Sequence, residues 1–305
     1  MVGQLDLRRL HTLRVVDQQG TVTAAAELLH LTPSAVSHQL AQLARELGLP
    51  LLERRGRRVY LTPAGQALVS HADDLSARWE RARAELDDHS GDLTGLVRIH
   101  GFPSAVAGLL VPVVERLAES HPGLCTSILE TEGMRGYDAL LTGEADVTVA
   151  VATAETPSVR EARFRQEPLL DEPLDLLVPA SHRLAGRTDV PVEDLREDDW
   201  IVPVAGSCDF YELTLAACTM AGFTPRIAHR ARDNFAVTAM VARGLGVAMI
   251  PRLAAAQPRG DTVRIPIGGH PRPCRQVMAC TRAGSEGQPE IEAVLAALRL
   301  VAGEV

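Results

Sequence analysis

The chain has 305 residues, 46% hydrophobic and 23% charged, which is typical of globular proteins and long enough for two or three domains. Residues 1–62 carry eight Arg and five acidic residues, whereas residues 91–305 carry twenty Arg and twenty-eight acidic residues. The sequence has no apolar run near the ~18 residues of a membrane span, no signal-peptide core and no C-x-x-C pair among its five Cys. We therefore expect a cytoplasmic protein with reduced thiols, no membrane contact and no zinc site.

Residues 23–65 have the pattern of a winged helix-turn-helix. Strong helix formers at residues 24–29 predict a short helix, and Thr32 and Pro33 predict the N-cap and first residue of a second helix. Apolar residues within a narrow arc predict the buried face of that second helix: Val36, Leu40, Leu43 and Leu47. Its other face suits a DNA groove, since it holds Ser34, Ser37, His38, Ala41, Gln42 and Arg45. We expect DNA contacts from Thr32, Pro33, Ser34, Ser37, His38 and Gln42.

A basic hairpin is predicted to follow this helix. Gly48 favours a helix end, and residues 51–62 read as two short strands around a glycine tip. Four arginines crowd that tip: Arg54, Arg55, Arg57 and Arg58. Their mutual repulsion is tolerable beside a polyanion, and Arg suits phosphates and a narrow minor groove. The alternatives are a solvated basic loop, or a helix-turn-helix used only for protein contact.

The run from residue 24 to residue 65, with PSAVSHQL, LGLPLLERRGRR and LTPAG, resembles the DNA-binding domain of LysR-type transcriptional regulators. Leu52 departs from the Phe that is usual there, and His38 from a frequent Arg. The resemblance implies a sequence-specific regulator that binds double-stranded DNA and acts on the transcription machinery. His38 makes the base preference harder to infer.

A long helix is predicted over residues 63–88. Its apolar residues have the spacing of a heptad seam: Leu68, Ala72, Leu75, Trp79, Ala82 and Leu86. One interpretation packs this stripe against its own chain, and the other pairs it with the same helix of a second subunit. The position beside the DNA-reading unit favours the second interpretation, and the resemblance implies a dimerising linker helix. A homodimer or homotetramer is expected, with two recognition helices on two half-sites.

Strands and helices alternate after residue 91. Strands are predicted at 96–100, 124–129 and 145–151, with helices at 105–119 and 137–142, which is the βαβαβ order of a parallel sheet. A second series follows with strands at 174–178, 200–204, 225–229 and 246–250, and helices at 209–221 and 235–243. The tail adds a strand at 277–281 and a helix at 289–300 that are expected to rejoin the first lobe.

The segments GLVRIHGFPS, ALLTGEADVTVAV, PLDLLVPASHRLA and MVARGLGVAMIP resemble the effector-binding domain of the LysR family. The resemblance implies a fold similar to a periplasmic solute-binding protein, with two lobes, two crossover strands and a ligand between them. The expected fold class is an N-terminal all-α winged helix-turn-helix domain and a C-terminal two-lobed α/β domain. The expected domains are 1–62, linker 63–90 and effector domain 91–305, with lobe I at about 91–167 and 267–305 and lobe II at about 168–266.

Ligands of open α/β sheets lie past the C-terminal strand ends, beside helix N-termini. The residues at these places are Phe102, Pro103, Ser104, Thr131, Glu132, Gly206, Ser207, Asp233 and Asn234. We expect them to bind a small-molecule effector, with no other cofactor. The competing interpretation for Ser104, Ser207 and Asn234 is helix capping alone.

Enzyme motifs are missing from the sequence: it has no H-E-x-x-H, G-x-S-x-G or P-loop. We therefore expect a regulator and not an enzyme. The alternative signal is redox, because Cys208 begins a predicted helix, where the dipole lowers a thiol pKa, and Cys218 lies in the same helix. A bridge between them requires that helix to unfold, since ten residues of helix span about 15 Å.

Overall fold

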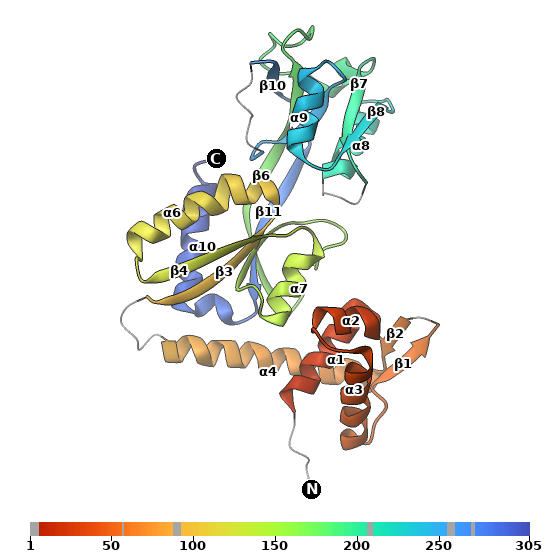
Figure 1. Cartoon of the computed structure of the whole chain (residues 1–305), viewed down its shortest axis with the longest axis vertical. Helices are drawn as coiled ribbons and strands as arrows, with labels where there is room; N and C mark the ends of the chain where they lie inside the picture. The colour runs from red at the N-terminus through yellow and green to blue at the C-terminus, as the bar shows by residue number, and fades with distance from the viewer. Residues whose placement is uncertain (1–5, 57, 88–92, 206–209, 255–259, 270–271) are drawn as a thin grey trace.

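The computed structural model describes residues 6–56, 58–87, 93–205, 210–254, 260–269 and 272–305. In Figure 1 the helix-turn-helix domain and the long helix α4 lie at one end of the long axis, with α4 running across that axis, and two α/β lobes follow beyond them. In the described part of the chain, no helix is long and apolar enough to cross a membrane.

The helix-turn-helix domain consists of three helices and a two-stranded wing, with the bounds α1 Leu7–Gln19, α2 Val22–Leu28, α3 Pro33–Leu47, β1 Leu52–Arg55 and β2 Arg58–Leu61. No helix was predicted where α1 lies. The predicted helix end at Gly48 is confirmed by its left-handed φ of 68°. The predicted burial of Leu47 is wrong, because this side chain is 41% exposed. The chain turns at Gly48, and Leu51 completes the core instead.

Helix α4 spans Pro63–Asp87. The predicted long helix is confirmed up to Asp87, and residue 88 lies outside the described residues. Its first turns pack on the helix-turn-helix core through Leu68, Val69 and Ala72. Farther along, Leu75, Trp79 and Leu86 are 43%, 64% and 70% exposed. The predicted seam is therefore divided between an intrachain part and an exposed part.

Lobe I, as named here, comprises three parallel-paired strands and the helices that cover them. The strands are β3 Gly95–Gly101, β4 Leu124–Glu130 and β5 Val147–Val151, and the helices are α5 Pro103–Ala105, η1 Val106–Leu110, α6 Val111–Ser120, α7 Met134–Thr142 and α10 Pro289–Ala302. β3 pairs in parallel with both β4 and β5, which confirms the predicted βαβαβ unit. The single helix expected at 105–119 contains the π-helical turn η1, in which Val111 N bonds to Val106 O.

Lobe II comprises four strands and two helices: β7 Asp199–Pro203, β8 Arg226–Ala231, β9 Ala248–Pro251, β10 Thr262–Pro266, α8 Phe210–Met220 and α9 Asn234–Ala242, preceded by the short helix η2 Val192–Leu195. The two crossover strands β6 Phe164–Pro179 and β11 Cys274–Arg282 run antiparallel and connect the lobes. The short helix η3 Ser285–Gly287 follows β11.

Both crossover strands are longer than predicted, and β10 was missed. The charged and proline residues before the predicted strand at 174–178, such as Pro168, Asp171 and Pro173, resemble a loop in the sequence. Pairing with β11 over nine residues turns this segment into a strand.

Candidate DNA interface and effector pocket

The start of α3 is fixed by local capping. Ala35 N donates to Thr32 Oγ1 at 3.2 Å, and Pro33 occupies the first turn, so the predicted N-cap is confirmed. Thr32 Oγ1 also lies 3.0 Å from the exposed Ser34 hydroxyl. The hydroxyl of Thr32 is thus engaged in holding the helix start, and Ser34 stands beside it at the surface.

Near the middle of α3, His38 is exposed to solvent, while Ser37 and Gln42 are partly buried. Gln42 Nε2 donates to Glu46 Oε1 at 3.1 Å, and Arg9 Nη1 donates to the same oxygen at 2.5 Å. Gln42 must therefore leave an intrachain bond before it contacts a base. His38 carries no such cost.

The wing arginines differ in their surroundings. Arg55 Nη2 lies 2.5 Å from Glu53 Oε1, and its guanidinium lies 5.3 Å from the centre of the Tyr60 ring. Arg54 and Arg58 are exposed, and Arg57 lies outside the described residues. The charge of Arg55 is partly neutralised by Glu53, a role the sequence analysis did not assign.

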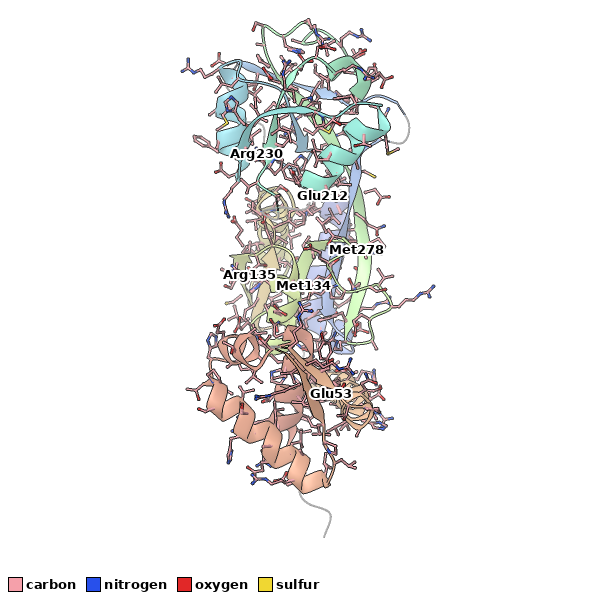
Figure 2. The ribbon with its side chains drawn as sticks, turned by 90° about the vertical axis from the view of Figure 1, so that its right-hand side faces the viewer. Glu53, Met134, Arg135, Glu212, Arg230 and Met278 are labelled. Atoms are coloured by element: carbon pink, nitrogen blue, oxygen red, sulfur yellow. The ribbon has the colours of Figure 1, made fainter. Side chains whose placement is uncertain are left out.

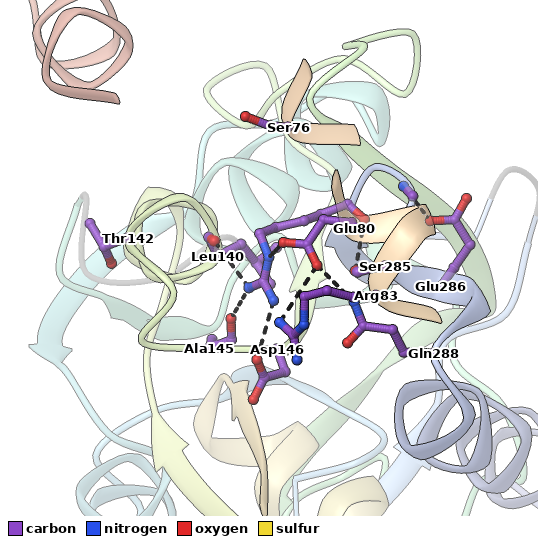
Figure 3. Close-up of polar contacts among 12 residues, drawn as sticks. Ser76, Glu80, Arg83, Leu140, Thr142, Ala145, Asp146, Ser285, Glu286 and Gln288 are labelled. Atoms are coloured by element: carbon purple, nitrogen blue, oxygen red, sulfur yellow. Dashed lines mark hydrogen bonds and ion pairs between the residues drawn. The ribbon is translucent and has the colours of Figure 1, made fainter. Parts of the chain in front are cut away.

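Helix α4 is joined to lobe I by a polar network around Glu80 (Figure 3). Arg282 Nε donates to Glu80 Oε1 at 2.9 Å, and Gln288 Nε2 donates to Glu80 Oε2 at 2.7 Å. Arg282 also donates to Ala145 O at 2.7 Å and lies 3.3 Å from Asp146 Oδ1. The side of α4 that carries Glu80 therefore contacts lobe I of its own chain, whereas Trp79 is exposed to solvent.

A cavity of about 300 Å³ lies where β3, β4 and β5 end in lobe I. We call it the lobe I pocket. Phe102, Thr131 and Glu132, all predicted as effector contacts, line it together. The other residues that line the pocket were not predicted, and they are Gly133, Met134, Gly136, residues 148–151, Thr153, Glu155 and Thr156. Among the described residues, the buried Thr131 hydroxyl has no hydrogen-bond partner, so it is a free polar group at a strand end.

Ser104 is neither a helix cap nor part of this pocket. Arg275 Nη2 donates to Ser104 Oγ at 2.6 Å, and the same guanidinium lies 4.5 Å from the centre of the Phe102 ring. Arg275 Nε also donates to Glu172 Oε2 at 2.7 Å, and both side chains of this ion pair are at most 2% exposed. The capping interpretation of Ser104 is wrong, because a residue far along the chain binds its hydroxyl.

The remaining predicted contacts are distributed differently. Pro103 is exposed in the first turn of α5. Asp233 caps α9 by accepting from Ala236 N at 2.7 Å, so the N-cap is Asp233 and not Asn234, which is the first helical residue. Gly206 and Ser207 lie outside the described residues. Figure 2 shows Glu212 and Arg230 at the end of lobe II that is nearest lobe I. Met134 and Arg135 lie in lobe I.

Two of the cysteines are fully buried. Burial raises the pKa of the Cys218 thiol to about 12, and it raises that of Cys280 to about 12 as well. Cys125 and Cys274 are exposed, and Cys208 lies outside the described residues. Cys218 is thus a protonated core residue in this fold.

Comparisons with known proteins agree with this arrangement. Residues 90–302 match the LysR substrate binding domain, and residues 7–66 match the bacterial regulatory helix-turn-helix protein of the lysR family. The chain is 30% identical to the transcriptional dual regulator GltC of Bacillus subtilis, over 86% of each protein. It is 29% identical to a probable hydrogen peroxide-inducible genes activator of Streptomyces viridosporus, over 97% of this chain and 94% of that protein.

A full-length OxyR variant from Pseudomonas aeruginosa has a similar fold, with a TM-score of 0.67 and 25% identity over 98% of this chain and 96% of that one. Full-length BenM, at 22% identity, matches with a TM-score of 0.61 over 98% of this chain and 97% of that one. Regulators of this family bind DNA and small-molecule effectors and form oligomers. The chain belongs to the LysR family of transcriptional regulators, with an N-terminal DNA-binding domain and a C-terminal effector-binding domain.

Proposed function

We propose that this regulator reads its operator through α3 and the wing, and that a small molecule in the lobe I pocket sets its activity. The observation that carries the proposal is the pocket itself, where Phe102, Thr131 and Glu132 meet at the ends of three strands. The buried Thr131 hydroxyl is an orienting group for such a ligand. The residues support regulation by binding, with no cofactor besides the effector and no catalytic step.

The DNA contacts follow from exposure and charge. Ser34, Ser37, His38 and Gln42 are assigned to the major groove, because α3 presents them on one side. Arg54, Arg55, Arg57 and Arg58 are assigned to the phosphates or the minor groove. Thr32 and Pro33 support this surface by fixing the start of α3.

The oligomer is assigned to the exposed part of α4. Leu75 and Trp79 line a groove of about 800 Å³ between α1, α4 and lobe I. A second copy of α4 would remove this apolar surface and Leu86 from water. The proposal is a homodimer, or a pair of such dimers, that places two α3 helices on two half-sites and contacts the transcription machinery from the bound operator.

The test begins with the purified full-length protein and fragmented genomic DNA. Sequencing the bound fragments identifies the operator, and the neighbouring genes indicate which small molecules to assay. A true effector should raise the melting temperature of the parent protein and change its operator affinity. Thr131→Val should weaken both responses and leave operator affinity without effector near that of the parent. A protein that selects no DNA sequence would overturn the assignment of α3.

Redox sensing is the second candidate, because one relative is named a probable hydrogen peroxide-inducible genes activator. Cys208 and Cys218 would be the reacting pair, yet burial of Cys218 disfavours its thiolate. Peroxide treatment followed by peptide mass spectrometry distinguishes the candidates. A Cys208 to Cys218 bridge that alters operator binding, and that Cys208→Ser removes, would favour redox sensing over the pocket.

A further inference from the structure

Helix α7 contacts the lobe I pocket with its first turn and the helix-turn-helix domain with its middle residue, Asp138. In Figure 1 it lies beside that domain at the lower edge of lobe I. We propose that α7 transmits occupancy of the lobe I pocket to the orientation of the helix-turn-helix domain of the same chain. The inference rests on the proposed function, since it names how the effector site controls DNA binding.

The first end of α7 forms part of the pocket wall. Gly133, which precedes the helix with a φ of 56°, lines the pocket together with Met134 and Gly136. Thr148 lines it too, and its hydroxyl donates to Gly136 O at 3.1 Å. A molecule that enters the pocket therefore touches both the first turn of α7 and the strand residue bound to it.

The middle of α7 holds the end of α1. The Asp138 carboxylate accepts hydrogen bonds from Gln18 Nε2 and from Gln19 Nε2, the latter at 3.0 Å. Arg163 Nη1 donates to Gln18 Oε1 at 3.2 Å. A partly buried carboxylate that accepts two amides is a directional contact, and residues 120 positions apart in the chain form it.

Helix α7 is tightly packed between its first turn and Asp138. Tyr137 and Leu140 are fully buried, and Tyr137 Oη donates to Gln166 Oε1 at 2.8 Å. At Gly136 the helix backbone lies directly on the sheet, because a Cβ there would stand 2.4 Å from Thr148 Cγ2. A packed helix of nine residues spans about 13 Å and shifts as one body.

A second fixed point converts such a shift into a rotation. The helix-turn-helix domain packs on α4 through Val69 and Ala72, and Glu80 binds α4 to Arg282 of lobe I. A displacement of α7 relative to that joint pushes on Gln18 and Gln19, while α4 stays attached. The domain then tilts about α4, which changes the position of α3 in an oligomer bound to two half-sites.

The test uses a chemical probe in place of the unidentified effector. Met134→Cys is placed in a full-length background with Cys125→Ser, Cys208→Ser and Cys274→Ser, and is modified with methyl methanethiosulfonate, with completeness checked by intact mass. Hydrogen exchange is then measured by mass spectrometry. Modification should change exchange of the amides at residues 18–20 by about fivefold or more, the lower end of ordinary coupling between sites.

Three comparisons make the result specific. In the double variant Gln18→Ala and Gln19→Ala, modification should still change hydrogen exchange in α7 but no longer in α1. Gln66→Ala, at an exposed position of α4, should leave both changes in exchange in place. Modified Met220→Cys, on lobe II and 68% exposed, should leave residues 18–20 unchanged. If Met134→Cys does not fold, the same modification is made at Thr156→Cys, which also lines the pocket.

Unchanged exchange at residues 18–20 after complete modification would overturn the coupling, whether or not α7 itself responds. Failure of the proposed function has a separate signature, because it appears as the absence of a selected operator or of an effector response in the parent protein. The exchange result stays readable in that case, since it requires neither DNA nor effector.

Discussion

His38 is an exposed candidate for base reading on α3, whereas its neighbours Ser37 and Gln42 are partly buried. His38→Ala should change preference at one position of each half-site by ~1–3 kcal/mol, because one imidazole reaches one base edge. Operator selection with parent and variant, compared with Gln66→Ala, measures this. Identical selected motifs would rule out base reading by His38.

The wing arginines should contribute unequally to the salt dependence of DNA binding. Arg54 and Arg58 are exposed, whereas Arg55 is paired with Glu53 at 2.5 Å and already partly neutralised. Arg54→Ala or Arg58→Ala should each lower the slope of log K against log salt by roughly 1, and Arg55→Ala by less. Titrations at several salt concentrations test the order. A larger effect of Arg55→Ala would show that Glu53 releases it on DNA.

His100 should make the fold sensitive to acid. This β3 residue is 4% exposed, and burial lowers its pKa below the ordinary 6.5, with Arg98 acting in the same direction and Glu144 and Asp146 opposing. The unfolded chain therefore binds the proton more readily than the folded chain. The contribution of His100 to the free energy of unfolding is fully present above pH 6.5, and it decreases as the pH falls from there, by at most about 1.4 kcal/mol per pH unit.

Calorimetry between pH 7 and pH 5 on parent and His100→Leu isolates this residue. The melting temperature of the parent should fall relative to that of the variant as the pH falls. The groups whose pKa burial raises, such as Asp17 and Asp73, act in both proteins and cancel. A difference that is constant with pH would exclude His100 as the titrating group.

At the scale of elements, α4 combines two packing surfaces in one helix. Ala72 is 3% exposed and belongs to the helix-turn-helix core, so the interpretation of intrachain packing holds for the first turns. Leu75, Trp79 and Leu86 remain exposed in the single chain. The heptad spacing of a seam did not reveal this division, because it depends on where lobe I and α1 dock.

Leu75→Arg should shift the protein to lower-mass species and weaken operator binding, since a charge in an apolar seam must be desolvated on pairing. Sedimentation velocity at several concentrations measures the mass, with Gln66→Arg as the matched exposed control on the same helix. If the Leu75 variant kept the mass of the parent, the subunits would have to associate through another surface.

At the scale of the whole molecule, the two lobes share one buried charge pair on the crossover strands. Glu172 accepts from Arg275 Nε at 2.7 Å and from Leu253 N at 2.6 Å, so β6 and β11 are held together where the chain passes between the lobes. Arg275 also binds Ser104 at the edge of lobe I. This guanidinium thus adds a side-chain link to the backbone pairing of β6 and β11.

Glu172→Leu should cost ~3–5 kcal/mol of stability, because it removes the buried carboxylate that accepts from both Arg275 Nε and Leu253 N. The double variant Glu172→Leu and Arg275→Leu should recover most of that loss. Urea unfolding measures both, and Arg299→Ala, in an exposed pair with Glu167, should cost within about 1 kcal/mol. A double variant as unstable as the single one would mean that Arg275 acts mainly through its other contacts.

The sequence by itself determined the features that depend on neighbouring residues. Thr32, Pro33 and Gly48 are capping signals within one helix, and they placed α3 correctly. The alternation of apolar runs placed the βαβαβ unit, and with it Phe102, Thr131 and Glu132 at strand ends. Backbone hydrogen bonding and the periods of helix and strand are local, so a single sequence contains them.

Which polar side chains already have a partner depends on contacts between residues far apart in the chain. Ser104 carries the sequence of a helix cap, yet Arg275 binds it from 171 residues away. Asp138 accepts from Gln18 and Gln19 across the boundary between lobe I and the helix-turn-helix domain. Such partners are selected by how layers pack, because a buried polar group must find a donor or acceptor wherever the fold places one. Periodicity and capping rules carry no information about residues so far apart in the chain.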